Sequence, residues 1–480
     1  MDIKLVFRVL GKLYCSIGII MISILPIDLI YGEPFIKSIL ICSATPIVIG
    51  IALIIFLKSD KSLGIKEGIG VIVFGWISVS FFSSLFYIFS GSLESFTDVF
   101  FESVSGFTTT GASVISDIES LPKSVIFWRS MTHWIGGIGI VMFALMILPI
   151  LGGGGMRIYQ TETSNLGQVK FTPRIVGTVR IIFLIYLSLT ALETILLTVF
   201  GMPLFDAIIH SFGTVATGGF SSKNLSIGEY NNLSFEITII IFMILSGINY
   251  IFYFNIFRRK IRESLVAEEL RFYLIIILIS SILVIITLRI FNYESIRDSI
   301  RYGVFQVVSL NTTTGFTTSD YNKWNEFSQI VLIGLMLIGA CPGSTSGAIK
   351  NIRILVIIKS IYIEIKRILH PQAELIIKIG GTSIRNLEIR KVKTFVTLYL
   401  LSFFIFTLIM LLTGLDLKSA FSSVAATLGG VGPGLGMVGP AENYASIPIF
   451  GKWVLCLCMF LGRLEFYSFF IILLPEFWSK

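Results

Sequence analysis

Long apolar runs separated by short clusters of charge constrain the fold of this chain more than any other feature of its sequence. About ten runs reach the ~20 residues that an α-helix needs to cross a bilayer. Only 14% of the residues are charged, whereas a soluble domain carries about 25%. We therefore expect an all-α polytopic membrane protein, and we exclude a cytosolic enzyme, a disordered chain, a nucleic-acid binder and a disulfide scaffold. The expected spans are 13–32, 36–57, 67–90, 125–151, 179–201, 234–257, 272–292, 327–365, 394–413 and 448–474.

The loops between these spans alternate in charge. Basic residues gather in every second loop, as the positive-inside rule requires of cytoplasmic loops, and the longest basic stretch covers 366–393. The intervening loops carry acidic residues such as Asp98, Asp206 and Asp298. We therefore expect a multi-pass protein with both termini in the cytoplasm. The same rule explains the net charge of +8 without any binding of nucleic acid.

Every outer loop after the first pair of spans contains an apolar segment that is too short to cross the bilayer. Each segment is followed by a turn rich in threonine or glycine. Short apolar segments of this kind are typical of re-entrant half-helices, and four copies of helix, half-helix, loop and helix indicate an internal repeat. The segments are 96–107, 204–214, 295–310 and 417–427.

The four turns can be aligned on one glycine each: Gly111, Gly218, Gly315 and Gly432. Irregular backbone at membrane depth must be buried in protein or line a water-filled path. Glycine permits positive φ, and four loops around an axis can replace the hydration shell of a cation with carbonyl oxygens. Four ordinary extracellular turns are the alternative, but such turns need no apolar half-helix before each one. The predicted filter residues are Thr109, Thr110, Gly111, Ala112, Ala216, Thr217, Gly218, Gly219, Thr313, Thr314, Gly315, Phe316, Gly430, Val431, Gly432 and Pro433.

A polar stretch interrupts the run at 327–365. A continuous helix there would be about 58 Å long, too long for one crossing of about 30 Å. We predict a gate beneath the filter, with a structural kink as the alternative. Arg463 lies near the middle of the last span, where a charge needs a buried partner. We expect it to bind carbonyl groups of the polar stretch and to hold the closed state; an arginine that merely joins two helices is the alternative. The predicted gate residues are Cys341, Pro342, Gly343, Ser344, Thr345, Ser346, Gly347 and Arg463.

In two pairs of charged or polar residues, the two members lie four positions apart in the sequence. Asp98 and Glu102 lie in the first half-helix, where they could concentrate cations at a pore mouth or satisfy local hydrogen-bond donors. Arg129 and His133 lie on the span that follows. For these two we favour a structural hydrogen-bonded pair over a proton relay.

The sequence resembles the Trk/Ktr/HKT superfamily of potassium transporters over essentially its whole length. Residues 127–139 (FWRSMTHWIGGIG) look like the second helix of that family's first repeat, and 340–353 (ACPGSTSGAIKNIR) look like its glycine-rich intramembrane loop. The final helix is similar in GRLE at 462–465 and PEFW at 475–478. The two spans before the first repeat are similar to the Trk type and lacking in the shorter Ktr type. Pro342, Ser346 and Ala348 depart from the family's loop pattern.

The resemblance implies four helix–pore-helix–helix repeats around a pseudo-fourfold pore, preceded by two extra N-terminal transmembrane helices. It also implies a homodimer in the bacterial inner membrane, with a TrkA-like nucleotide-binding ring docked on the basic cytoplasmic face. K⁺ would be the transported ion, without a covalent cofactor, and ATP, ADP or NAD would bind only the partner subunit. The expected domains are the extra helix pair at 1–62 and the pore repeats at 63–155, 156–262, 263–370 with the gating loop, and 371–480.

The expected function is potassium uptake through a gated, channel-like path driven by the membrane potential, which is worth ~2.3 kcal/mol per charge for each 100 mV. A proton- or sodium-coupled potassium symporter on the same scaffold is the main alternative. A membrane-embedded enzyme is disfavoured, because the sequence offers no nucleophile motif or cluster of catalytic residues. A small-solute transporter would have inverted repeats, whereas these repeats all run in the same direction.

Overall fold

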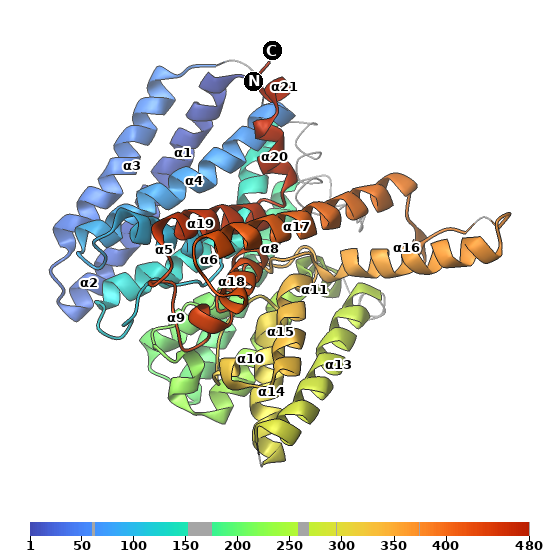
Figure 1. Ribbon diagram of the computed structural model, residues 1–480. Coiled ribbons are helices and arrows are strands. Elements are labelled where there is room, and N and C mark those ends of the chain that lie inside the picture. Colours follow the sequence, from blue (N-terminus) through green and yellow to red (C-terminus); the bar gives the residue numbers. More distant parts are fainter. Residues whose placement is uncertain (60–62, 152–174, 258–267, 294, 374, 480) are drawn as a thin grey trace.

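The computed structural model describes residues 1–480 except 60–62, 152–174, 258–267, 294, 374 and 480 (Figure 1). Within the described residues the chain is helical, apart from one hairpin in which β1 (Lys378–Ile379) pairs antiparallel with β2 (Thr382–Ser383). The expected all-α class is therefore confirmed, with this short hairpin as a small departure.

The N-terminal helices pack closely through glycines. α1 (Ile3–Met21) continues through η1 (Ile22–Ile24) into α2 (Leu25–Tyr31), and α3 (Ile36–Phe56) runs back beside it. A Cβ atom at Gly11 would lie 2.7 Å from the carbonyl oxygen of Gly50, and one at Gly18 would lie 2.5 Å from that of Ser43. Small residues let helices in a membrane approach in this way. The pair packs against α4 (Ile65–Phe89) (Figure 1).

The rest of the chain consists of four successive units, each with a long helix, a short helix and a further helical segment. The short helices start and end within two residues of the expected half-helices. The first unit contains α4, α5 (Phe96–Phe107) and α6 (Lys123–Leu151), and the second contains α8 (Ile175–Val199), α9 (Leu204–Val215), η3 (Ser226–Tyr230), α10 (Leu233–Gly247) and α11 (Tyr250–Phe257). The third contains α13 (Glu268–Phe291), α14 (Ile296–Asn311), η4 (Tyr321–Lys323), α15 (Glu326–Ile338) and α16 (Asn351–Leu369). The fourth contains α17 (Asn386–Leu412), α18 (Leu417–Gly429), η5 (Gly436–Val438), α19 (Ile449–Arg463), α20 (Tyr467–Leu473) and α21 (Pro475–Trp478).

Six of the described helices are long and apolar enough to cross a membrane, or up to seven if the bent pair α19–α20 counts as one span. We expected about ten spans, and part of the difference arises because three of them are broken. The break expected within 327–365 is confirmed, since 339–350 separates α15 from α16. The unbroken spans expected at 234–257 and 448–474 are wrong: α10 ends at Gly247 before α11 begins at Tyr250, and α19 meets α20 at an angle of 115°.

Tertiary hydrogen bonds explain why these breaks are tolerated. The amide of Cys341 donates to the carbonyl oxygen of Gly247, and the amide of Tyr250 donates to that of Gly343, both at 3.1 Å. The backbone groups freed at the α10–α11 break are therefore satisfied by the polar stretch of the third unit, as irregular backbone in a membrane requires. At the α19–α20 bend, Glu465 and Phe466 both adopt left-handed φ values, of 53° and 58°.

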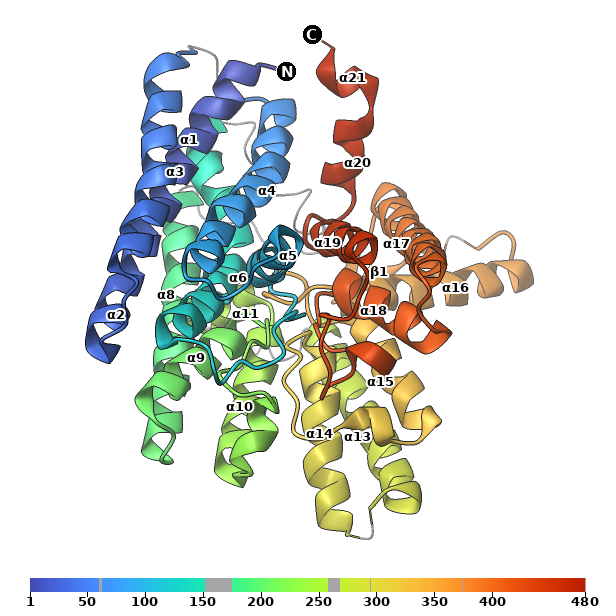
Figure 2. The same ribbon diagram turned by 60° about the vertical axis from the view of Figure 1, so that its left-hand side comes forward.

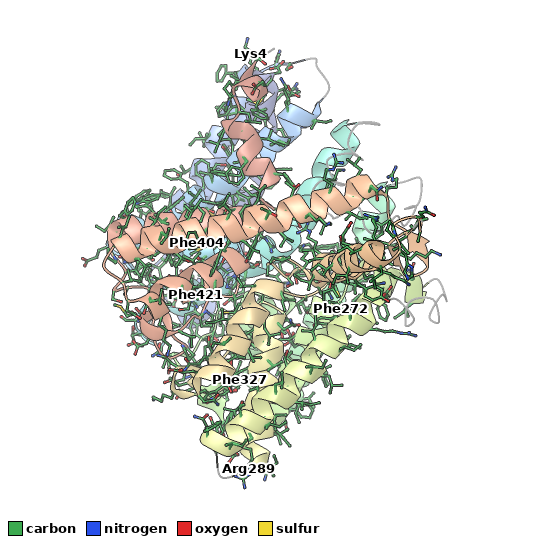
Figure 3. The ribbon with its side chains drawn as sticks, turned by 45° about the vertical axis from the view of Figure 1, so that its right-hand side comes forward. Lys4, Phe272, Arg289, Phe327, Phe404 and Phe421 are labelled. Carbon is green, nitrogen blue, oxygen red and sulfur yellow. The ribbon has the colours of Figure 1, made fainter. Side chains whose placement is uncertain are left out.

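The short helices α5 and α18 lie near the middle of the molecule, and α14 extends from there toward its lower end in Figure 2. α16 and α17 form an arm that extends to one side, and the two termini lie close together at one end (Figure 1). Lys4, near the N-terminus, and Arg289, near the end of α13, lie at opposite ends of the molecule (Figure 3). The domain boundaries expected after 155 and 262 fall next to or within stretches outside the described residues.

Candidate functional site

The turns after the four short helices share one backbone pattern. The residue that leaves each helix has a left-handed φ, and a glycine two positions later has one as well. The left-handed leaving residues are Thr109, Thr217, Thr313 and Gly430, with φ values of 54°, 53°, 58° and 67°. The glycines that follow are Gly111, Gly219, Gly315 and Gly432, with φ values of 83°, 79°, 79° and 95°.

A hydrogen bond that recurs in all four turns aligns them in the same way as the φ values do. In each, the residue between the two left-handed positions donates its amide to the carbonyl oxygen five residues earlier, and the turn is thereby closed onto its own helix. The four bonds are Thr110 to Ser105 at 2.9 Å, Gly218 to Gly213 at 2.8 Å, Thr314 to Ser309 at 2.9 Å and Val431 to Ala426 at 2.8 Å.

This geometry corrects the alignment of the second turn. The sequence places two glycines together, and we aligned Gly218 with the other filter glycines; the structure gives that place to Gly219. Gly218 instead corresponds to Thr110, Thr314 and Val431. It still needs to be small, because a Cβ atom there would lie 2.6 Å from the His133 ring.

The four turns meet as a closed ring, in chain order. We call the second left-handed residue of each turn its ring glycine. A Cβ atom at each ring glycine would collide with the carbonyl oxygen of the residue before the ring glycine of the next turn. The colliding pairs are Gly111 with Gly218, Gly219 with Thr314, Gly315 with Val431, and Gly432 with Thr110. Glycine is therefore required twice at these positions, by its φ value and by the approach of the neighbouring turn.

The ring forms one wall of a small cavity. This cavity of about 80 Å³ is lined by the four ring glycines Gly111, Gly219, Gly315 and Gly432 and by residues of the segments that follow them. Tyr444 lines it as well, and its hydroxyl donates to the carbonyl oxygen of Gly432 at 2.7 Å. Sequence reasoning missed Tyr444, because nothing in the pattern of the last loop distinguishes it from other aromatic residues. Ala112, Phe316 and Pro433, also predicted for the filter, directly follow three of the ring glycines, and Ala216 caps the end of α9.

A buried ion pair supports the first turn. Arg129 on α6 contacts Glu102 on α5 at 2.6 Å, and both side chains are almost fully buried. Glu102 also accepts hydrogen bonds from the Ser113 hydroxyl and the Val114 amide, just beyond the ring. The expected pair of Arg129 with His133 is wrong: His133 Nδ1 lies 2.9 Å from the carbonyl oxygen of Gly106. Arg129 and His133 do lie on the same face of α6, as their spacing of four residues predicts, but each binds a group of α5 and not the other.

Two further ion pairs join short helices to other units. Asp98 on α5 binds Lys452 on α19 at 2.6 Å, and Arg301 on α14 binds Glu236 on α10 at 2.6 Å. Asp98 and Glu102 thus both take part in ion pairs within the protein. Sequence analysis did not identify Glu236, Arg301 or Lys452, because their partners come from distant segments.

The predicted gate stretch lies against the helix ends on the other side of the turns. Thr345 Oγ1 donates to the carbonyl oxygen of Val215 at the end of α9, at 3.1 Å. Thr313 contacts the Ser346 hydroxyl at 3.1 Å and accepts from the Gly347 amide at 3.0 Å. A Cβ atom at Gly347 would lie 2.5 Å from the carbonyl oxygen of Gly429. The stretch therefore touches the second, third and fourth turns; Cys341, Ser344, Thr345 and Ser346 are buried, and Pro342 and Gly343 complete the loop.

Arg463 connects this stretch to the first unit. Its guanidinium donates to the carbonyl oxygen of Thr345 at 2.9 Å and to that of Gly136 on α6 at 2.6 Å. The expected contact with a carbonyl group of the gate stretch is present, and the contact with Gly136 is an addition that the sequence did not indicate. Arg463 is buried, so all four units meet through the gate stretch and this side chain.

A second charged cluster lies where the gate stretch leaves the core. Glu465 binds Lys350 at 3.3 Å and Arg353 at 2.6 Å. Glu465 is therefore paired with residues other than Arg463, which lies two positions before it. The cluster ties the α19–α20 bend to the start of α16.

Comparisons with known proteins find relatives over most of the chain. A family model described as TrkH, cation transport protein, matches residues 37–479. The chain is 39% identical over 427 residues to the Trk system potassium uptake protein TrkH of Salmonella typhimurium, covering 88% of each chain. It is 34% identical over 490 residues to the protein of the same name from Halomonas elongata, covering 100% of each. It also matches the crystal structure of the potassium transporter TrkH from Vibrio parahaemolyticus with a TM-score of 0.90 and 33% identity, covering 100% of both chains.

Proposed function

Because the chain belongs to the TrkH family of cation transport proteins, we propose that it takes up potassium ions through a gated, channel-like pore with a carbonyl filter formed by four loops. The family consists of transport proteins and not of enzymes, and the chain is accordingly a multi-pass membrane transport protein. The observation that carries the proposal is the closed ring of turns, in which each left-handed glycine adjoins a carbonyl oxygen of the next turn.

The chemistry of such a ring suits a cation that must both bind and leave. Carbonyl dipoles can replace the hydration shell of K⁺ without a full charge that would trap the ion. The short helices add to this effect, because each directs its C-terminal, partly negative end toward its turn. We propose potassium rather than another cation because the relatives are named as potassium uptake proteins.

The stretch at 341–347 and Arg463 act as the gate in this proposal. The stretch packs against the ends of three short helices, directly behind the ring. The charge of Arg463 lies beside it, where it opposes the passage of another cation. In the open state the stretch moves aside, and its glycine and serine residues suit such a movement because they lack bulk.

We further propose the assembly that the relatives' name, Trk system, suggests. The chain forms a homodimer in the bacterial inner membrane, with both termini in the cytoplasm, and the exposed basic residues of the α16–α17 arm bind a TrkA-like nucleotide-binding subunit. The two termini lie at the same end of the molecule (Figure 1), which supports this orientation. The four pore repeats keep the boundaries expected from the sequence, at 63–155, 156–262, 263–370 and 371–480.

Growth at limiting potassium tests the proposal. A bacterial host without its own potassium uptake systems is given the full-length chain together with a matching TrkA-like subunit. Rescue of growth at low potassium is expected from the wild-type chain and from Gly414→Ser, since a Cβ atom added at Gly414 would have no other side chain or distant backbone atom within 4 Å. Absence of rescue, with the chain confirmed in the membrane, would contradict potassium uptake.

A further inference from the structure

An apolar cavity separates the N-terminal helices from the pore units. Its volume is about 290 Å³, and its walls come from α1, α4, α6 and α8. Leu13 on α1, Trp76 on α4, Trp134 on α6 and Phe183 on α8 stand on these walls. At its inner end the cavity reaches Phe107, the last residue of α5.

Water is a poor occupant of this cavity. A buried water needs two to four polar partners, and the walls present no polar surface to the cavity. Two polar groups of the lining residues are hydrogen-bonded to other residues. The Ser16 hydroxyl donates to the carbonyl oxygen of Lys12 at 3.0 Å, and Trp134 Nε1 donates to the Thr190 hydroxyl at 3.1 Å. An empty cavity is also unfavourable, because its walls lose their van der Waals contacts.

The cavity opens toward the surface that faces lipid. Leu13, Trp134 and Phe183 are only half-buried. On α1 and α8, Ile19 and Leu184 are 62% and 49% exposed. In a spanning helix such apolar side chains contact acyl chains. We propose that this cavity binds an acyl chain of a membrane lipid. A flexible hydrocarbon chain can enter between helices, whereas the face of a second copy of the protein cannot.

The bound chain contacts two parts of the proposed pore. Phe107 directly precedes the turn that contains Thr109 and Gly111. Trp76 also lies near Arg463, whose guanidinium carbon is 5.9 Å from the centre of the tryptophan ring. The cavity therefore places a lipid against the support of the first turn and beside the arginine of the gate.

Photo-crosslinking tests the site in the full-length chain. The protein is reconstituted in vesicles that contain a phospholipid with a diazirine midway along one acyl chain, then irradiated and analysed by peptide mass spectrometry. Adducts are expected on Trp76, which is 4% exposed and is therefore beyond the reach of lipid on the outer surface. Exposed Ile19 and Leu184 report labelling by bulk lipid.

A cavity-filling variant and a matched control make the test specific. A Cβ atom at Gly139 would lie 3.5 Å from the Trp76 ring, an ordinary contact, so Gly139→Leu directs its side chain into the cavity. Gly334 on α15 has no other atom within 4 Å of its Cβ position, and Gly334→Leu adds the same bulk elsewhere. If Gly139→Leu does not fold, Ser16→Phe fills the cavity from α1.

The outcomes separate cleanly. Adducts on Trp76 that persist in Gly334→Leu and fall severalfold in the filled variant support a lipid site. The proposal is overturned if Trp76 is unlabelled while Ile19 and Leu184 are labelled, because another occupant or none then fills the space. It is also overturned if labelling of Trp76 is unchanged when the cavity is filled.

Discussion

Arg463 and Thr345 are joined by a hydrogen bond of 2.9 Å from the guanidinium to the main-chain carbonyl oxygen. The bond connects the end of α19 to the middle of the stretch between α15 and α16. Because the same guanidinium also binds the carbonyl oxygen of Gly136, the arginine holds the stretch from one side while the ends of α9 and α14 contact it from another. This relationship makes Arg463 the residue whose removal should release the stretch most directly.

Replacing Arg463 with alanine should raise potassium flux. The variant loses the hydrogen bond to Thr345 in the stretch, the hydrogen bond to Gly136 on α6 and its unit of positive charge. Hydrogen bonds to charged groups contribute about 1.5–3 kcal/mol each. Selectivity should change little, because the ring of glycines is untouched. The measurement is K⁺ and Na⁺ flux in vesicles that contain the purified chain.

Arg353 provides the control for that variant. It is also buried and basic, but it binds Glu465 and the carbonyl oxygen of Ile349 and none of the gate residues 341–347. Arg353→Ala should therefore leave flux closer to wild type. A folded Arg463→Ala protein with flux at or below the wild-type level would count against its role in the gate.

Cys341 should report movement of the stretch. Its side chain is 0% exposed, so a water-soluble thiol reagent should modify it slowly in the closed protein. In a variant with Cys341 as the sole cysteine, the rate of modification should rise when Arg463 is also replaced by alanine. A matching variant that retains only Cys458, also 0% exposed, should stay slow in both backgrounds; equal rates for Cys341 with and without Arg463 would favour a structural kink.

The short helices were predictable from the sequence because their length and apolarity leave few alternatives. A segment such as 96–107 is too short to span and too apolar for an exposed loop, and α5 occupies those residues. The contact of Arg463 with the gate stretch was predictable for a related reason, since a charge in mid-span must find a buried acceptor.

Other features depend on contacts that no local pattern records. The adjacent Gly218 and Gly219 allow two alignments, and Gly219 is selected by the backbone φ values and the amide hydrogen bonds of the folded turns. The backbone groups at the break between α10 and α11 are satisfied by hydrogen bonds with Cys341 and Gly343, which lie about 90 residues further along the chain. The pairing of Arg129 with Glu102 likewise required the packing of two helices to be known.

Gly219→Ser should lower selectivity for K⁺ over Na⁺. A side chain at a left-handed position costs about 1–3 kcal/mol of strain, and this Cβ atom would also collide with the carbonyl oxygen of Thr314. Gly414→Ser is the matched control, because Gly414 has φ of 92° but no atom near its Cβ position. Ratios of K⁺ to Na⁺ flux compare the two variants, and equal ratios in both would argue that the second turn does not select ions.

Glu102→Gln should destabilise the protein strongly. Removing one partner of a buried ion pair typically costs about 3–5 kcal/mol, and Arg129 would remain buried without its carboxylate. The pair of Glu119 with Lys223 is much more exposed, at 37% and 30%, so Glu119→Gln should cost only about 1 kcal/mol or less. Thermal unfolding of both variants in detergent measures the difference, and similar losses would show that the Glu102–Arg129 pair does not brace the first turn.

The most direct test of the account is to locate the permeating ion. A structure determined in rubidium, which substitutes for potassium and can be located by anomalous scattering, should show an ion at the centre of the ring formed by the turns of Gly111, Gly219, Gly315 and Gly432. The peak should weaken in Gly219→Ser. A rubidium site elsewhere in the membrane region, with the ring unoccupied in a protein that still transports rubidium, would contradict the claim that these four turns form the filter.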